Sequence, residues 1–316
     1  MVAFSDVVSA RDALAGRLPV TPLWTYPAVN EVADATVYVK HENVQPVGAF
    51  KVRGGFTLLA AMPESRRRGG LVTWSTGNHA QSIAYACREF DVRCTIVMPV
   101  LTSEEKMRAV RVLGATVVLD GADLGAAQAR AEQIVAEGNG HLVSPGDTPE
   151  LVAGVGTAYM EVFEAVSDLD AVVVPIGSGT GAAAAAIVAG VMAPGCDVIG
   201  VQSTAAPAAY ESWRSGTCVR RPARTVVDGL AVGRGYELPQ RLMKGALADF
   251  LLVTDDQIVT AQRLMATHAH TLAEGAGAAG LAAVLAHPDT FRGRRVAVVC
   301  TGGNASSREI AALVSA

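Results

Sequence analysis

The chain has few cysteines and none in a metal-binding or redox arrangement. Its 316 residues include five cysteines, an odd number, scattered with no CxxC pair. A zinc site and a redox motif are therefore disfavoured, and the pattern is typical of reduced thiols in a cytoplasmic protein. The N-terminus also lacks the basic and then apolar segments of a signal peptide, so we expect a cytoplasmic location.

A long apolar run and a strongly basic face are also missing. The longest apolar stretch, Gly181–Ala193, is mostly alanine and is shorter than the roughly 20 residues that a membrane-spanning helix needs. The formal net charge is −4, and the only basic run, Arg66–Arg68, lies in a polar, glycine-flanked stretch that we interpret as a solvated loop. We therefore expect neither a membrane protein nor a nucleic-acid-binding protein.

Half of the residues are hydrophobic, and they form short runs of alternating type. Runs rich in Val, Ile and Thr predict strands at Thr36–His41, Gly70–Trp74, Cys94–Met98, Thr116–Leu119, Ala171–Pro175, Asp197–Gln202 and Arg295–Cys300. The stretches between them predict helices at Phe56–Met62, Asn78–Phe90, Ser103–Leu113, Leu124–Glu137, Pro149–Ala165 and Thr180–Ala193. Apolar strands separated by helices indicate an α/β fold whose sheets are mostly parallel and covered on both faces.

The length suits two subdomains. Residues 70–147 contain three successive strand–helix steps, which predict a small sheet of their own. We expect them to form a small domain, with 1–69 and 148–316 forming a large one. Within the small domain, Thr102 and Glu105 match a capping box at a helix start.

Lysine is scarce, and one lysine has apolar residues and glycines as its sequence neighbours. The four are Lys40, Lys51, Lys106 and Lys244. Lys51 lies within Pro46–Gly55, between Phe50 and Val52, where a strand-to-loop segment turns into a helix. A buried lysine has a lowered pKa and is a good amine nucleophile. On local sequence alone, a lysine that caps the helix or pairs with a carboxylate is an equal alternative.

Two loops after predicted strands are suited to anions. Ser75-Thr76-Gly77-Asn78-His79-Ala80-Gln81 opens a helix, which Ser75 or Thr76 can cap, and Gly77 lets a ligand approach the backbone. The unpaired N–H groups and the dipole of such a helix start favour a carboxylate or a phosphate. A capped helix start that merely includes His79 is the structural alternative.

Gly177-Ser178-Gly179-Thr180-Gly181 follows another strand and forms a phosphate cradle. With Ala182 it also fits the dinucleotide pattern GxGxxA, but the next strand ends in Gln202, where a dinucleotide site needs an acid. The loop therefore suits a lone phosphate better than NAD, and a plain tight turn is the structural alternative.

Two further polar positions complete the set. Thr301 ends the last strand, within Cys300-Thr301-Gly302-Gly303-Asn304, and ligands bind at such strand ends in open α/β sheets. Glu274 opens a turn of small residues, and a structural role is an open alternative there. An amine nucleophile, an anion-binding helix start, a phosphate cradle and a neutral hydroxyl are together what pyridoxal phosphate needs.

These motifs occur in the order found in fold-type II pyridoxal-phosphate enzymes, which the chain resembles from about Thr21 to Ser307. Thr225-Val226-Val227-Asp228-Gly229-Leu230-Ala231-Val232 belongs to the same series. The sequence most resembles threonine/serine dehydratases and serine racemases. The resemblance implies a tryptophan synthase β-like fold, a large domain that binds pyridoxal 5'-phosphate, a small mobile domain and a homodimer.

The resemblance also implies a role for each motif. Lys51 would hold the cofactor as a Schiff base and then take the α-proton of the substrate. Cofactor contacts would come from Phe50, Asn78, Gly177, Ser178, Gly179, Thr180, Gly181, Glu274 and Thr301. Ser75, Thr76, Gly77 and His79 would surround the substrate carboxylate. A hydroxyl at Thr301 leaves the pyridine nitrogen largely unprotonated, which favours β-elimination from a β-hydroxy amino acid to give a 2-oxo acid and ammonia.

The chain departs from the family pattern at several places. Gln202 and Ala208 replace the carboxylates of the racemase-like metal site, so we predict that this site is absent. Gly146 replaces an aromatic residue of the dehydratases, which predicts a wider substrate side. Thr76 stands where racemases place a serine, so amino acid racemisation is the second hypothesis. An NAD-dependent oxidoreductase and a catalytically silent binding protein are alternatives from outside this class.

Overall fold

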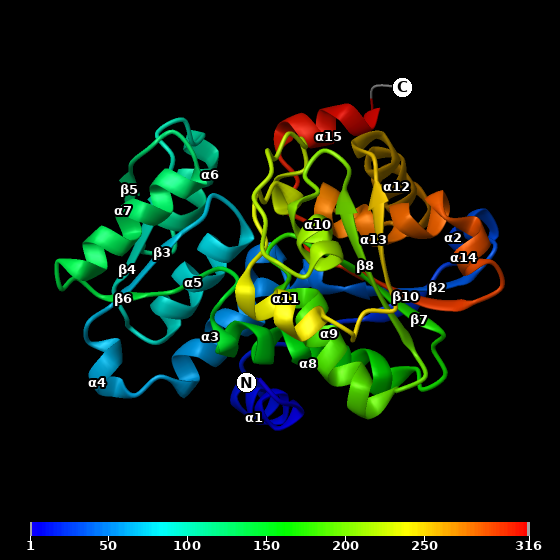
Figure 1. Cartoon of the computed structure of the whole chain (residues 1–316), viewed down its shortest axis with the longest axis horizontal. Helices are drawn as coiled ribbons and strands as arrows, with labels where there is room; N and C mark the ends of the chain where they lie inside the picture. The colour runs from blue at the N-terminus through cyan, green and yellow to red at the C-terminus, as the bar shows by residue number, and fades with distance from the viewer. Residues whose placement is uncertain (1, 315–316) are drawn as a thin grey trace.

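The computed structural model describes residues 2–314, which form a larger and a smaller lobe, each built around its own sheet (Figure 1). The larger sheet has the strand order β1-β2-β10-β7-β8-β9. Its strands are β1 (Leu23–Thr25), β2 (Thr36–His41), β10 (Arg295–Cys300), β7 (Ala171–Pro175), β8 (Asp197–Ser203) and β9 (Asp249–Val253). Neighbouring strands are parallel except for β1, which runs antiparallel to β2 at one edge.

The smaller sheet is parallel throughout and has the order β5-β4-β3-β6. Its strands are β3 (Leu71–Trp74), β4 (Cys94–Met98), β5 (Thr116–Leu119) and β6 (His141–Leu142). The predicted α/β fold with two mostly parallel sheets is confirmed. The apolar core beneath this sheet also includes Leu14, Phe56 and Leu151, from outside 70–147, so the predicted domain boundaries stay a prediction.

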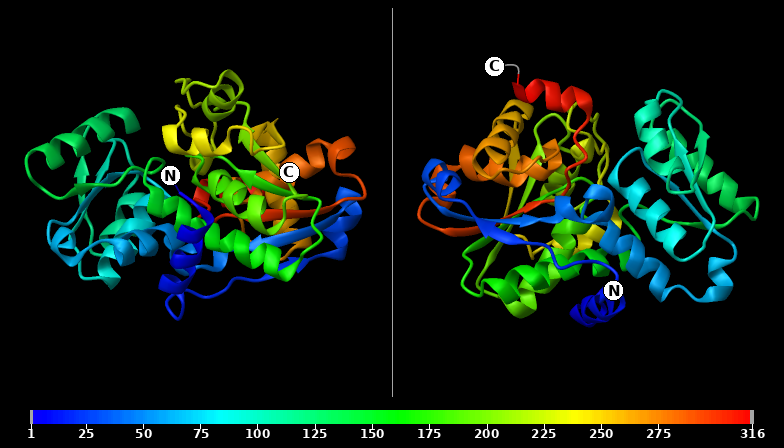
Figure 2. Two further views of the ribbon diagram at one scale, coloured as in Figure 1. Left: turned by 60° about the horizontal axis from the view of Figure 1, so that its bottom comes forward. Right: turned by 180° about the vertical axis from the view of Figure 1, so that it is seen from behind.

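Helices cover both faces of each sheet (Figure 2). The α-helices are α1 (Phe4–Leu14), α2 (Pro27–Ala33), α3 (Lys51–Ala61), α4 (Glu64–Arg67), α5 (Asn78–Glu89), α6 (Glu104–Arg111), α7 (Leu124–Ala136), α8 (Pro149–Ala165), α9 (Thr180–Met192), α10 (Ala208–Ser215), α11 (Glu237–Met243), α12 (Asp255–His268), α13 (Gly275–Ala286), α14 (Pro288–Phe291) and α15 (Ser307–Val314). Short 3-10 helices are η1 (Glu42–Val44), η2 (Pro46–Gly48) and η3 (Asp228–Leu230). Within residues 2–314, no helix combines the length and the apolar character that crossing a bilayer requires.

The centre of the larger lobe explains why its sequence reads as continuous apolar runs. Every residue of β7 is buried, because α8 and α9 pack on one face of the sheet and α12 and α13 on the other. The first two turns of α9 are almost entirely alanine, and these small side chains let the helix lie close to the sheet. In the same way, α5 and α7 cover opposite faces of the smaller sheet.

The predicted elements match the observed ones to within one or two residues at most ends, and the exceptions have physical causes. The strands β1, β6 and β9 were not predicted; β1 and β6 have only three and two residues, and pairing with their neighbours defines them. The helix predicted from Phe56 begins earlier, at Lys51. The predicted capping box is wrong: Ser103 is the N-cap of α6, and Thr102 instead donates its hydroxyl to the carbonyl of Pro99.

Candidate active site

A cavity of about 880 Å³ lies between the two lobes, and both contribute to its wall. Its lining includes Trp74, Pro175 and Thr301, at or just after the C-terminal ends of β3, β7 and β10. Ligands bind at this end of the strands in open α/β sheets. Every residue predicted for the site lines this one cavity, although the residues come from segments far apart in the sequence.

Lys51 is the first residue of α3, and its amine points at the glycine loop. Its Nζ donates to Oγ of Ser178 at 3.2 Å and to Oγ1 of Thr180 at 2.5 Å. No carboxylate pairs with this amine within residues 2–314. Burial in the cavity wall therefore lowers the pKa of Lys51 to about 8, since nothing offsets the lost hydration of the charged form.

The segment before Lys51 is fixed to the end of the larger sheet. The Phe50 N–H donates to the carbonyl of Thr301 at 3.0 Å, which ties the start of α3 to the end of β10. Gly48 has φ +66°, and a Cβ at this residue would lie 2.7 Å from Oδ1 of Asn304. Glycine is thus required here by both conformation and space. These contacts place Phe50 and Lys51 in the cavity wall.

The glycine loop forms a cradle of free backbone donors at the start of α9. Its first helical hydrogen bond runs from Ala183 N–H to the carbonyl of Gly179, so the N–H groups just before it have no partner within the helix. Gly179 has φ +94°, and its Cβ would approach Pro239 to 2.7 Å. At Gly177 a Cβ would lie 2.4 Å from the carbonyl oxygen of Gly229. The loop is therefore held in a shape that presents N–H groups and two hydroxyls to an anion.

The second predicted anion loop lies across the start of α5. The expectation that Ser75 or Thr76 caps this helix is wrong, because the N-cap is Gly77 and no side chain caps it. Instead, Oγ of Ser75 accepts the N–H of Gly77 at 3.2 Å. A Cβ at Gly77 would meet no protein atom within 4 Å, so the space beside it belongs to the cavity. The free N–H groups of the first turn of α5 are suited to a carboxylate.

His79 lies beneath this loop and carries no charge. Its Nε2 lies 2.8 Å from Oγ1 of Thr73, whose proton is donated to the carbonyl of Val143. The imidazole must therefore donate through Nε2, which fixes its tautomer. Burial, with a smaller contribution from the nearby Lys51 charge, lowers the pKa of His79 to about 3. At neutral pH this side chain carries no charge to neutralise an anion, and its single N–H is already donated to Thr73.

Glu274, Asn78 and Asn304 form a polar chain along another part of the wall. Nδ2 of Asn78 donates to Oε1 of Glu274 at 2.6 Å, and Nδ2 of Asn304 donates to Oδ1 of Asn78 at 2.8 Å. Burial raises the pKa of Glu274 to about 7, although the bond from Asn78 opposes that shift. The chain fixes which way the Asn78 amide faces. Thr301 completes this wall with a hydroxyl at the end of β10.

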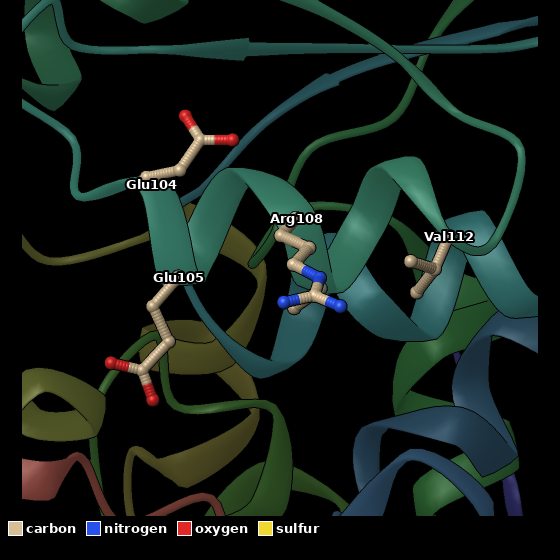
Figure 3. A pocket seen from close by; sticks show the side chains of 5 residues that line it. Glu104, Glu105, Arg108 and Val112 are labelled. Carbon is tan, nitrogen blue, oxygen red and sulfur yellow. The ribbon is translucent and has the colours of Figure 1, made fainter.

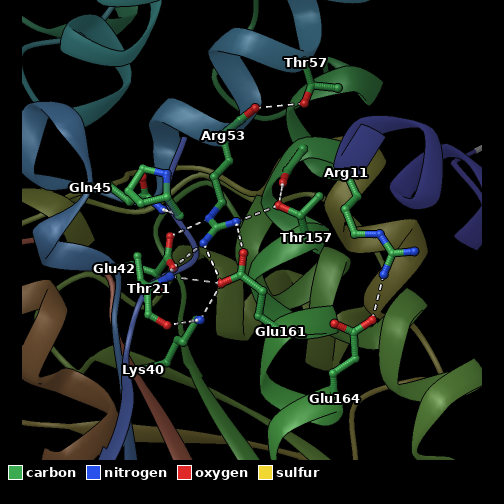
Figure 4. A network of polar contacts seen from close by, with 12 residues as sticks. Arg11, Thr21, Lys40, Glu42, Gln45, Arg53, Thr57, Thr157, Glu161 and Glu164 are labelled. Atoms are coloured by element: carbon green, nitrogen blue, oxygen red, sulfur yellow. Dashed lines mark hydrogen bonds and ion pairs between the residues drawn. The ribbon is translucent and has the colours of Figure 1, made fainter. Parts of the chain in front are cut away.

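A buried ion-pair network lies beside the Lys51 segment and was not predicted (Figure 4). Arg53 donates to both oxygens of Glu42, at 2.7 and 2.8 Å, and also contacts Glu161 at 2.7 Å. Lys40 donates to Glu161 at 2.5 Å. Two cations and two carboxylates cancel, so the network is neutral while joining β2, η1, α3 and α8. The sequence signal for this pairing was a lysine within the apolar strand β2 and a glutamate directly after it.

A shallower hollow lies on the outer face of α6 (Figure 3). It is lined by Glu104, Glu105, Arg108 and Ala109 of α6 and by Val112, the C-cap of that helix. The charged side chains are exposed, and Val112 is 66% exposed. The hollow brings together no buried polar group, so we assign it no part in catalysis.

Comparison with known proteins identifies the family of this chain. The family model described as pyridoxal-phosphate dependent enzyme matches residues 16–302. The chain belongs to this family. It is 35% identical to an L-threonine ammonia-lyase of Thermotoga maritima, over 96% of this chain and 76% of that protein. It is 31% identical to an L-threo-3-hydroxyaspartate ammonia-lyase of Saccharomyces cerevisiae, over 99% of this chain and 96% of that protein.

Solved structures agree with the family assignment. A serine racemase from Dictyostelium discoideum superposes with a TM-score of 0.90 at 31% identity, covering 96% of this chain and 99% of that one. Threonine deaminase isoform 2 from Solanum lycopersicum superposes with a TM-score of 0.91 at 26% identity, covering 98% and 91%. The fold-type II architecture expected from the sequence motifs is confirmed.

The cavity fits the cofactor of this family. An anionic tail needs backbone donors, and the cavity-lining loop Gly177–Gly181 supplies N–H groups that have no partner within α9. An aldehyde needs an amine that loses its proton easily, and Lys51 has hydroxyl partners in place of a counter-charge. An aromatic ring needs an apolar neighbour, and Phe50 lines the same wall. Pyridoxal phosphate therefore suits the donors that this chain presents.

Gln202 lies outside the cavity lining and is fully buried. Its Oε1 accepts the N–H of Tyr210 at 3.1 Å near the end of β8. This position gives no acid for a dinucleotide ribose, so the oxidoreductase alternative has no support.

Within residues 2–314, no three His, Cys, Asp or Glu side chains are grouped to hold a metal. The predicted absence of the racemase-like metal site stays a prediction.

The structure corrects one expectation about the substrate side. Gly146 was expected to widen it, but a Cβ at this residue would lie 2.3 Å from Cγ of Tyr236. The ring of Tyr236 therefore fills the place of the missing aromatic side chain, and the expectation is wrong. Arg234 lies over the same ring, 4.9 Å from its centroid. Both residues line the cavity but come from an irregular segment, so no periodic signal pointed to them.

Proposed function

We propose that the chain catalyses the pyridoxal-phosphate-dependent deamination of a β-hydroxy amino acid by α,β-elimination, giving a 2-oxo acid and ammonia. The observation that carries this proposal is the Lys51 amine, which lies against the phosphate cradle with hydroxyl partners and no carboxylate. Relatives that are themselves named threonine and hydroxyaspartate ammonia-lyases support the reaction type.

The residues that would hold the cofactor follow from the cavity wall. The backbone and hydroxyls of Gly177–Gly181 would bind its phosphate, and Lys51 its aldehyde. Phe50, Asn78, Glu274 and Thr301 would contact its ring. Bound pyridoxal phosphate supplies an electron sink for bond cleavage at the α-carbon of an amino acid. The neutral hydroxyl of Thr301 would leave the ring nitrogen largely unprotonated, and this weaker electron sink would favour elimination.

The remaining groups bind the substrate and move its protons. The first-turn N–H groups after Gly77, with the hydroxyls of Ser75 and Thr76, hold the α-carboxylate. Neutral His79 supports that loop from below through its bond to Thr73. Lys51, whose pKa is about 8, is partly neutral near physiological pH and removes the α-proton through Nζ. Water is limited because the cavity lies between two lobes.

The assay is a panel of β-hydroxy amino acids given to the cofactor-loaded enzyme. Both threonine diastereomers, serine, 3-hydroxyaspartate and phenylserine are followed for ammonia, 2-oxo acid and the opposite α-isomer. We expect equal amounts of ammonia and oxo acid from at least one of them. Ammonia release from none would overturn the proposal.

Racemisation is the second candidate, and it has specific support. The chain superposes closely on a serine racemase, and the Thr76 hydroxyl lines the cavity where it can hold a proton for the second face of the α-carbon. Prompt formation of the opposite isomer without oxo acid would make racemisation the main activity. We also propose, by family analogy, a cytoplasmic homodimer, which sedimentation of the purified protein tests.

A further inference from the structure

The cavity wall contains more cationic side chains than its own carboxylates neutralise. Lys106 pairs with Asp228 at 2.6 Å, and Arg221 pairs with Glu211 at 2.6 Å. Arg220 and Arg234 also line the cavity, and within residues 2–314 neither has a carboxylate partner. Besides Asp228, the acidic residues of the lining are Asp123 and Glu274. Those two acids are already bonded, Asp123 to the first turn of α7 and Glu274 to Asn78. The wall therefore keeps two guanidinium groups, of Arg220 and Arg234, whose charge no carboxylate neutralises.

Arg234 is the better placed of the two, because its side chain is held in position. Its guanidinium lies over the ring of Tyr236, and Nη1 donates to Oε1 of Gln128 on α7 at 3.2 Å. Nε donates to the carbonyl of Gly235 at 3.4 Å. An arginine has five N–H donors, so three stay unused. A fixed, planar guanidinium with unused donors is suited to binding a carboxylate through two parallel hydrogen bonds.

The position of Arg234 places its unused N–H donors on the side of the cavity where we expect the side chain of the substrate. Tyr236 packs against Gly146, the position that corresponds to an aromatic residue on the substrate side of the dehydratases. Two anions are already assigned elsewhere: the cofactor phosphate to Gly177–Gly181 and the substrate α-carboxylate to the start of α5. An anion at Arg234 would therefore be a third one.

We propose that Arg234 is a specificity-determining residue that binds a carboxylate on the substrate side chain, so that the preferred substrate is an acidic β-hydroxy amino acid of the 3-hydroxyaspartate class. This inference rests on the proposed function. Arg220 lies near the same ring: burial raises the pKa of Tyr236, and the charges of Arg234 and Arg220 oppose that shift. The guanidinium bridges to α7 through Gln128, so it lies where the two lobes meet in the cavity wall.

The kinetic test compares 3-hydroxyaspartate with 3-hydroxyasparagine, its uncharged isostere, and with threonine. Wild-type enzyme should show the highest kcat/KM for the acid. Arg234→Gln should lower kcat/KM for the acid on the order of 100-fold more than that for threonine, chiefly through KM. Arg234→Lys should recover part of the loss, because it restores the charge but not the planar donor pair. Arg224→Gln, in the same loop but outside the cavity lining, is the matched control.

A binding test needs no turnover. Malate lacks the amine that reacts with the cofactor and carries two carboxylates, whereas lactate carries one. Calorimetry on the loaded enzyme should show tighter binding of malate than of lactate, and Arg234→Gln should abolish that difference.

The outcomes separate the two proposals. Equal losses for the acid and for threonine in Arg234→Gln would show that Arg234 acts only by holding the lobes together, and would overturn this inference. So would a wild-type preference for the uncharged isostere. Deamination of threonine with no effect of charge at Arg234 leaves the proposed function standing. Failure to deaminate any β-hydroxy amino acid, with the malate preference intact, would overturn the proposed function and the substrate class, and would leave Arg234 only as a carboxylate-binding residue.

Discussion

Lys40 and Lys51 both carry an amine into the interior of the larger lobe, but their surroundings differ. Lys40 donates to Glu161 within the neutral network that Figure 4 shows, and the carbonyl of Thr21 accepts a second bond from it. Lys51 has two hydroxyl partners and no carboxylate. The two buried amines therefore differ in whether a carboxylate lies beside them, and we expect only Lys51 to be reactive. A buried amine becomes a nucleophile where the fold withholds its counter-charge.

The largest effect should come from removing the Lys51 amine, which ends the difference between the two buried lysines. Lys51→Ala should lower ammonia release by at least about 10³-fold, since the nucleophile and the base are lost together. The visible absorbance band of the lysine-attached cofactor should disappear as well. Lys244→Ala changes an exposed lysine and serves as the control. Wild-type activity in Lys51→Ala would refute the assignment.

Breaking the network beside Lys40 should affect folding rather than chemistry. Arg53→Met leaves Glu42 fully buried without its cation, so the free energy of unfolding should fall by about 3–5 kcal/mol in urea titrations. The matched control is Arg68→Met, which breaks a pair with Glu64 on the surface and should cost less than about 1 kcal/mol. Equal costs for the two variants would mean that the buried network is not a structural element.

Replacing each lysine by methionine should change stability in opposite directions in the cofactor-free protein. At pH 7, Lys40→Met should lower the free energy of unfolding by about 2 kcal/mol, because charge-assisted hydrogen bonds are lost. Lys51→Met should raise it by up to about 3 kcal/mol, because the wild-type amine is charged in both states and is poorly hydrated when folded.

The pH dependence gives the sign of the Lys51 effect. Its pKa is about 8 in the folded protein and 10.5 for an ordinary lysine. Between these values the unfolded chain binds more protons, so wild-type stability rises with pH. The advantage of Lys51→Met should therefore be complete below pH 8 and vanish near pH 10.5, as followed by thermal unfolding. If the stability difference between Lys51→Met and wild type does not change with pH, its cause is side-chain packing and not the charge of Lys51.

The smallest effects should come from two glycines near α9 that differ in surroundings. Gly179→Ala adds a Cβ at φ +94° and 2.7 Å from Pro239, so it should weaken cofactor binding and cost about 1–3 kcal/mol of stability. Gly190→Ala lies within α9, where a Cβ meets nothing within 4 Å, and should stabilise by about 0.5–1 kcal/mol. Equilibrium dialysis of the cofactor and urea titration measure both. Equal cofactor affinities would show that the cradle tolerates a side chain.

Several parts of the site were predictable because they depend on local sequence. A lysine among apolar and glycine residues, and glycine-rich turns between a strand and a helix, are short patterns with a direct physical meaning. The strands around them were predictable because they are buried on both faces and therefore read as apolar runs. These strands end at the cavity, so their C-terminal residues were expected to meet.

Other parts were decided by contacts between distant segments. Tyr236 fills the space beside Gly146, and Arg234 lies on that ring, yet they come from a segment without periodicity. The partner of Lys40 lies on α8, far along the chain. The cap of α6 was misassigned because Thr102 and Ser103 are adjacent hydroxyls, and only the path of the backbone selects between them.

The amino-acid sequence by itself determined the family and the two-sheet architecture, and it singled out Lys51 as the candidate amine, because each depends on short local patterns of residues. Only the tertiary structure decided which buried lysine has a carboxylate beside it and which guanidinium faces the cavity with unused donors. The physical reason is that electrostatic character depends on what lies within a few ångströms in space. Residues that are close in space need not be close in sequence.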